Sequence, residues 1–159
     1  RIYMKIAKNI VTVISMLIIS ATANAKDLEK APKFKEYPVE LSKTKNTSIT
    51  EWSGYEDFKT RIKNAIKAKP NAAGKYIITG WGCGGGCHNY VIINKETGKV
   101  LPYSLGNYDA DYDIDDNGTL PNSKLIVLRK EDTAFFNILD NDKLELIGTM
   151  PALKDEESQ

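Results

Sequence analysis

Histidine, cysteine and tryptophan are scarce in this chain of 159 residues, with one histidine, two cysteines and two tryptophans. So few ligands leave no second pair of cysteines or histidines to complete a tetrahedral zinc site. Long apolar runs are also lacking, since residues 10–19 form a stretch about half as long as the roughly twenty residues of a membrane-spanning helix. These absences argue against a structural zinc module and against a membrane-spanning protein.

Residues 4–25 instead have the three parts of a secretory signal peptide. Lys5 and Lys8 give a positive start, residues 10–19 an apolar centre, and residues 23–25 a small-x-small cleavage pattern. We expect cleavage after Ala25 and export to the periplasm of a Gram-negative bacterium, with secretion as the alternative. No cysteine follows the cleavage point, which argues against a lipid anchor.

An excess of basic charge is missing as well. Cleavage would remove three basic residues and no acid, which leaves 19 basic against 21 acidic residues and a net charge of −2. Nucleic-acid binding requires a concentrated basic face, so we expect no nucleic-acid partner. The remaining 134 residues suit a single domain.

The N-terminal part of this domain contains one predicted helix. Residues 26–50 are lysine-rich and interrupted by prolines, which predicts a flexible leader with a short edge strand. Apolar residues then recur at helical spacing over residues 55–66. At the start of this segment, Ser53 and Glu56 have the spacing of a capping box. We therefore expect one amphipathic helix.

From residue 76 the apolar period changes to two, which is typical of strands. Short turns between the strand segments favour antiparallel neighbours. The predicted fold class is α+β, an antiparallel β-meander of about five to six strands with one amphipathic helix packed on it, within residues 51–150. Residues 151–159 are predicted to be a disordered tail. The expected strands are residues 76–81, 88–94, 99–103, 124–130, 133–139 and 144–149.

The sequence WGCGGGCH, residues 81–88, contains both cysteines and the only histidine. Glycines at a hairpin tip supply positive φ, and three of them between two cysteines allow a bridging distance. In an exported protein a disulfide is the expected state, worth about 2 kcal/mol for so small a ring. We predict a Cys83–Cys87 disulfide that shapes a binding loop formed by Trp81, Gly84, Gly85, Gly86, His88 and Tyr90.

Other interpretations of this loop are weaker. Residues 80–85 match the dinucleotide pattern G-x-G-x-x-G, but a strand follows where that pattern needs a helix. Cys87 and His88 are successive residues of an extended segment, so their side chains point to opposite faces and do not form a nucleophile and base. The alternative that stays open is that Trp81 and Tyr90 belong to the core and that His88 is a polar strand-edge residue.

An acidic segment, residues 109–120, partly matches a calcium-binding loop. Asp113, Asp115 and Asn117 have the spacing of its first ligands, but Lys124 stands in place of the closing glutamate. We expect a solvated acidic loop and no cofactor. The alternative is weak calcium binding or an enzymatic use of the acids at 109–116.

Four sequence segments together resemble a family of small exported bacterial proteins of unassigned function. They are N-A-A-G-K-Y at 71–76, W-G-C-G-G-G-C at 81–87, T-G-K-V at 97–100 and N-S-K-L-I-V at 122–127. The resemblance covers residues 34–148 and implies a shared fold and an envelope location, without a catalytic residue. The chain departs from the family at Ala72, at His88 and in the length of the acidic loop. A looser architectural similarity links it to periplasmic lysozyme inhibitors.

We therefore expect an exported, monomeric binding protein rather than an enzyme. Its stapled loop would contact a protein or cell-wall partner, because a preorganised loop loses little entropy and aromatic residues anchor interfaces. The alternative is a periplasmic inhibitor or immunity-type protein against a lysozyme-like or other toxin enzyme.

Overall fold

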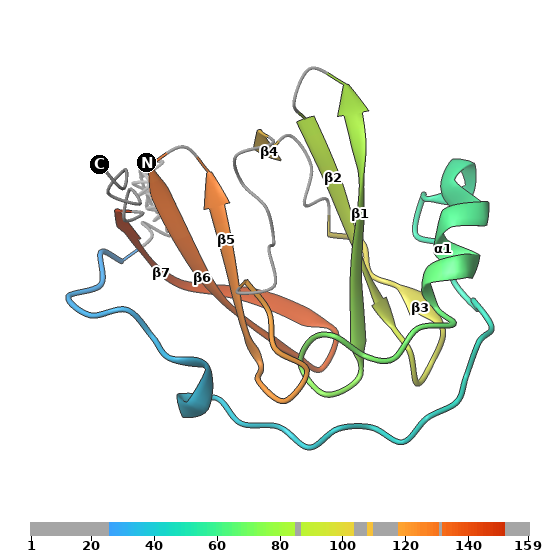
Figure 1. Ribbon diagram of the computed structural model, residues 1–159, viewed down its shortest axis with the longest axis horizontal. Coiled ribbons are helices and arrows are strands. Elements are labelled where there is room, and N and C mark those ends of the chain that lie inside the picture. The colour runs from blue at the N-terminus through green and yellow to red at the C-terminus, as the bar shows by residue number, and fades with distance from the viewer. Residues whose placement is uncertain (1–25, 85–86, 104–107, 110–117, 131, 152–159) are drawn as a thin grey trace, which may run out of the picture.

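The computed structural model describes residues 26–84, 87–103, 108–109, 118–130 and 132–151. These residues form two antiparallel sheets and one short α-helix, so the protein is mostly β (Figure 1). The expected antiparallel strands are confirmed, but a single meander is wrong, because the chain starts a new sheet after β4. The first sheet contains β1 (Tyr76–Gly84), β2 (Cys87–Asn94), β3 (Lys99–Val100) and β4 (Tyr108–Asp109), and the second contains β5 (Leu125–Lys130), β6 (Thr133–Asp140) and β7 (Lys143–Pro151).

The predicted helix is present but starts later than expected. A 3₁₀ turn, η2 (Glu56–Phe58), leads into α1 (Lys59–Ala65). The capping box is wrong, since Ser53 lies at φ +50° and its hydroxyl donates to the carbonyl of Val100 at 2.6 Å. The serine joins the helical segment to β3 instead of capping the helix.

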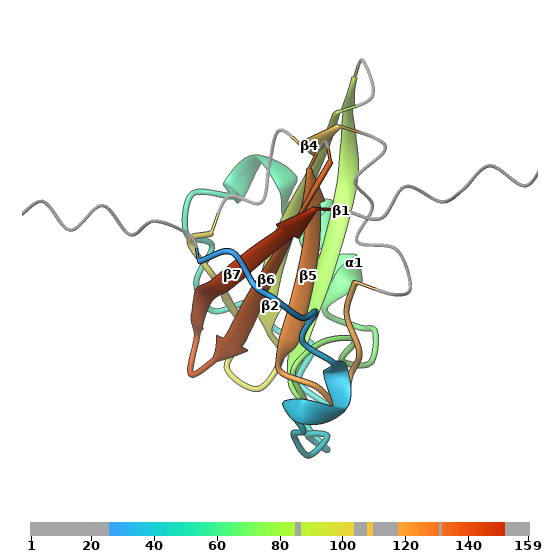
Figure 2. The ribbon, with the colours of Figure 1, turned by 90° about the vertical axis from the view of Figure 1, so that its left-hand side faces the viewer.

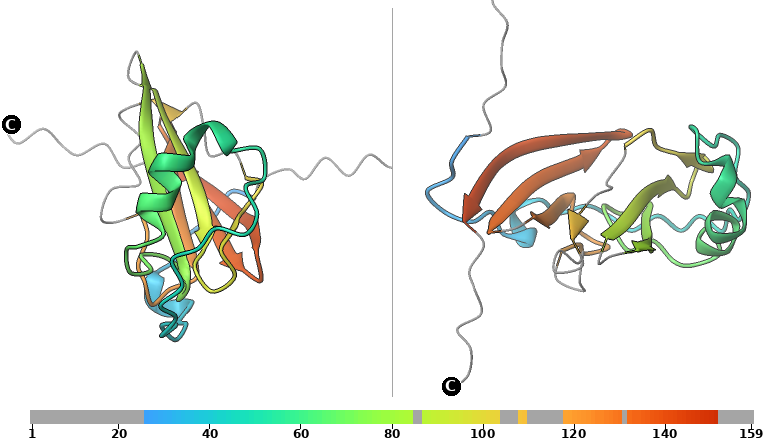
Figure 3. Two further views of the ribbon diagram at one scale, coloured as in Figure 1. Left: turned by 90° about the vertical axis from the view of Figure 1, so that its right-hand side faces the viewer. Right: turned by 90° about the horizontal axis from the view of Figure 1, so that it is seen from above.

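The alternating residues of β1 and β2 explain how the layers pack. Tyr76 and Ile78 face the second sheet, whereas Ile77 faces α1, because successive strand residues point to opposite faces. The core between the sheets also includes Ile92 and Ile126. Figures 1 and 3 show the resulting order of second sheet, first sheet and helix.

Residues 26–50, here called the strap, run along one side of the molecule from β7 toward α1 (Figure 1). The expected edge strand is not among its elements, which are a 3₁₀ turn, η1 (Phe34–Glu36), and isolated bridges from Asp27 to Thr149 and from Pro38 to Ser123. Three glycines outside the strap let the strap backbone pack closely against the rest of the protein. A Cβ would lie 2.7 Å from Lys26 O at Gly148, 2.4 Å from Glu40 O at Gly74 and 2.1 Å from Ser48 O at Gly98.

Candidate functional site

The end of the β1–β2 hairpin holds the predicted binding loop. Gly82 pairs with His88 and Gly84 with Cys87, with a register shift between the two pairs. Gly82, Cys83 and Gly84 are all exposed, and Figure 2 shows this end of β1 extending past the neighbouring strands. Gly84 has φ +95°, the left-handed conformation that was expected of glycines at the tip.

Trp81 and Tyr90 belong to the core and not to a free binding surface. Trp81 is 7% exposed and stacks on Phe58 with ring centroids 4.3 Å apart. Tyr90 is 8% exposed, and its ring lies so close to Gly80 that a Cβ there would be 2.4 Å from it. This burial favours the alternative in which both aromatics belong to the core, where they fix the base of the hairpin.

His88 lies on the same face of β2 as Tyr90. Their rings stack at 6.2 Å, and His88 pairs with Tyr108 of β4 across the sheet. Its Nδ1 is buried and has no hydrogen-bond partner within the described part of the chain. A buried polar atom without a partner is costly, so a hydrogen-bonding group brought within reach of this nitrogen would add stability.

Several predicted residues lie outside what the structure describes. Gly85, Gly86, the side chain of Cys87 and the calcium candidates Asp113, Asp115 and Asn117 are among them, as are residues 1–25 and 152–159. The Cys83–Cys87 disulfide and the calcium site therefore stay predictions. Among the described residues no cluster of three or more histidine, cysteine or acidic side chains could hold a metal.

A second feature was not anticipated from the sequence. A pocket of about 500 Å³ is lined by the strap, by residues 67–70 after α1, and by Lys95 in the turn between β2 and β3. Lys95 is only 4% exposed, although lysine is rarely buried. The strap and the C-terminal end of α1 cover it.

Comparison with family models, curated proteins and solved structures found no match. No helix within the described residues is long and apolar enough to cross a bilayer. The geometry of the chain itself is therefore the basis for a functional proposal.

Proposed function

We propose that this chain is an exported binding protein whose hairpin end contacts a protein partner. The observation that supports it is the exposed run Gly82–Gly84 at the end of a hairpin whose lower part is fixed by buried aromatic contacts. A rigid base and an exposed end reduce the entropy lost on docking. Export rests on the signal peptide predicted at residues 4–25.

The proposed disulfide between Cys83 and Cys87 would hold the end in one shape. Because glycine has no side chain, the backbone of the hairpin end and the side chain of His88 would make the contact. A narrow, projecting hairpin fits a concave partner surface better than a flat one. This shape favours an inhibitor-like role, in which the hairpin end enters the cleft of an envelope enzyme.

Site-specific photocrosslinking in the envelope tests the proposal. A photoreactive residue at Gly82 should give a discrete adduct, whereas one at the exposed Lys143, the first residue of β7, should not. The adduct should disappear in the Cys83→Ser/Cys87→Ser variant if the staple shapes the contact. Equal adducts from both positions, or none from Gly82, would refute contact through the hairpin end.

Purified protein should also be assayed directly against lysozymes. Inhibition that is lost in the double serine variant would assign the inhibitor role. A Gly82 adduct without inhibition would support the binding function and would exclude lysozyme as the partner.

A further inference from the structure

The pocket at the strap is lined by basic and neutral residues. Of the twelve residues that line it five are lysines and none is acidic. Because like charges crowd around one cavity of about 500 Å³, its positive potential is concentrated. The lysines are Lys43, Lys45, Lys67, Lys69 and Lys95.

Lys95 is the buried member of this group. Its ammonium donates to the carbonyl oxygen of Asn46 at 2.9 Å and to that of Ile66 at the end of α1. Both acceptors are neutral, and an ammonium has three donors. Two carbonyl dipoles stabilise the cation without neutralising it, and a buried charge without a counter-ion is costly. An anion in the pocket would offset that cost.

Three acidic side chains form ion pairs with lysines that do not line the pocket. Within the described ranges the ion pairs are Lys75–Glu96 at 3.4 Å, Lys99–Glu51 at 3.3 Å and Lys124–Asp140 at 2.7 Å. All three use lysines outside the pocket, and no described carboxylate lies within ion-pair distance of a pocket lysine. The described residues therefore leave the basic character of the pocket without a neutralising ion pair.

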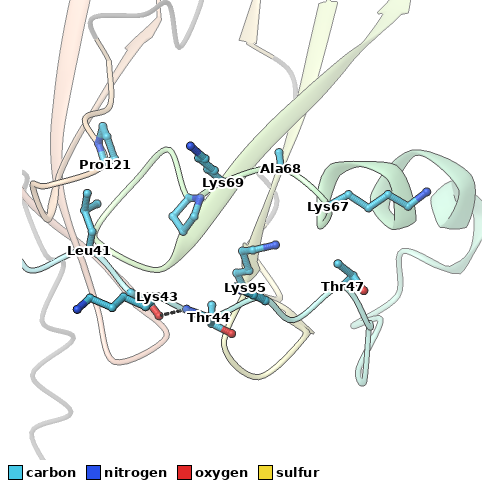
Figure 4. A pocket seen from close by; sticks show the side chains of 12 residues that line it. Leu41, Lys43, Thr44, Thr47, Lys67, Ala68, Lys69, Lys95 and Pro121 are labelled. Carbon is cyan, nitrogen blue, oxygen red and sulfur yellow. Dashed lines mark hydrogen bonds between the residues drawn. The ribbon is translucent and has the colours of Figure 1, made fainter.

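The remaining wall is largely apolar. Leu41, which is 53% exposed, lies at the edge of the pocket together with Pro70 and Pro121. Figure 4 shows Lys95 in the middle of this wall, with Lys43 and Lys67 extending outward on opposite sides. The buried cation is thus placed to fix a ligand, and the outer lysines to attract it.

We propose that this pocket binds a small organic anion. Its carboxylate or phosphate group would lie near Lys95, and its apolar part would pack against Leu41, Pro70 and Pro121. The volume lies within the range of small-molecule sites. This site is separate from the hairpin end, so either proposal can fail without the other.

Two charge-reversal variants with the same change in net charge test the proposal. Lys43→Glu/Lys69→Glu alters the pocket, whereas Lys63→Glu/Lys143→Glu alters two exposed lysines elsewhere, on α1 and β7. None of these four side chains is buried, so folding should be preserved in both variants. Lys95 is left intact, because its replacement would also remove two hydrogen bonds.

The probes are hexanoate, hexyl phosphate and hexylammonium, which share one alkyl chain. We expect either anion to shift the backbone amide resonances of Thr44, Ala68 and Lys69 saturably, and hexylammonium to leave them unchanged. The pocket variant should bind the anion about tenfold more weakly, with the control variant within about twofold of the parent.

Three results would overturn the proposal. They are absence of saturation by either anion below about 10 mM, equal shifts with hexylammonium, and an equal loss of affinity in the control variant. Binding of the protein to vesicles of phosphatidylcholine and phosphatidylglycerol is measured as well. Binding to these vesicles without binding of either small anion would show a membrane-surface patch and reject the small-molecule site. Hexanoate and hexyl phosphate, compared with each other, distinguish the two anionic groups.

Discussion

The hydroxyl of Tyr76 accepts a hydrogen bond from the backbone N–H of Asp142 at 2.8 Å and donates one to the carboxylate of the same residue at 2.9 Å. Tyr76 belongs to β1, and Asp142 lies in the turn between β6 and β7, so this reciprocal pair joins the two sheets. The side-chain amide of Asn94 donates to the same carboxylate oxygen at 2.7 Å. Since Tyr76 is 1% exposed, water does not easily replace these bonds.

Tyr76→Phe should lower the free energy of unfolding by about 1–3 kcal/mol, because it leaves the N–H and carboxylate of Asp142 without their buried partner. Urea denaturation measures the change. Tyr37→Phe is the matched control, since the Tyr37 ring packs beyond the second sheet and no described residue hydrogen-bonds its hydroxyl. That variant should stay within about 0.5 kcal/mol of the parent. Equal losses would mean that the hydroxyl of Tyr76 contributes nothing specific.

Alkaline pH should weaken the same connection. Burial raises the pKa of the Tyr76 phenol, and the hydrogen bond to the Asp142 carboxylate raises it further, although the Asp142 N–H opposes this. The folded state therefore retains the proton more strongly than the unfolded state. The stability that the protonated Tyr76 phenol contributes is complete below about pH 10. Above that value it is lost, at up to roughly 1.4 kcal/mol per pH unit. Urea midpoints between pH 8 and pH 11 should fall more steeply for the parent than for Tyr76→Phe, and parallel curves would contradict the prediction.

Strand positions were predictable because the segments are rich in β-branched and aromatic residues and are bounded by turn residues. Residues 76–81 and 133–139 were predicted, and the structure has Tyr76–Gly84 and Thr133–Asp140. Their division into two sheets was not predictable in this way, since it depends on tertiary packing that places residues such as Ile78 and Ile126 in one core cluster. Whether Trp81 and Tyr90 belong to the core or to a binding surface was not decidable for a related reason. A sequence pattern marks an aromatic residue on a strand but not the partner, such as Phe58, that covers it.

Lys95 was missed because a lysine in a polar turn has the signature of a surface residue. Its burial results from the strap and the end of α1, which are distant in sequence, closing over it. One signal was present, however. No aspartate or glutamate occurs at residues 41–50 or between residues 58 and 95. The two segments that build the lysine pocket are both acid-free, and only the fold brings them together.

Acid pH should loosen the strap at Glu96. The hydroxyl of Ser42 donates to its carboxylate at 2.7 Å, and Lys75 lies 3.4 Å from it. The Ser42 hydrogen bond lowers the pKa of Glu96, and Lys75 lowers it further, whereas partial burial raises it.

The stability that Glu96 contributes is thus present above the ordinary glutamate pKa of about 4.3 and lost as the pH falls below it. Because the side chain is 43% exposed, screening keeps the effect within about 0.5 kcal/mol. Thermal unfolding at pH 7 and pH 3 should show a smaller acid loss for Glu96→Gln than for the parent. Glu145→Gln, at an exposed position of β7, serves as the control and should match the parent at both pH values.

Gly98→Ala should release the C-terminal end of the strap from the turn before β3. Gly98 lies at φ +77°, and a Cβ there would be 2.1 Å from the carbonyl oxygen of Ser48. Gly54→Ala is the matched control, because Gly54 has a similar φ of +88° with no atom within 4 Å of the new Cβ. Both variants incur the left-handed alanine penalty of about 1–2 kcal/mol. Only Gly98→Ala should add a steric cost of about 1–3 kcal/mol.

Hydrogen exchange identifies where that extra cost arises. The N–H of Thr50 donates to the Gly98 carbonyl at 2.8 Å, so its exchange should accelerate in Gly98→Ala and not in Gly54→Ala. Since Asn46 and Lys95 share a hydrogen bond in the same part of the strap, the anion affinity of the pocket should fall along with Thr50 protection. Faster Thr50 exchange with unchanged affinity would show that the strap holds the fold together without shaping the pocket.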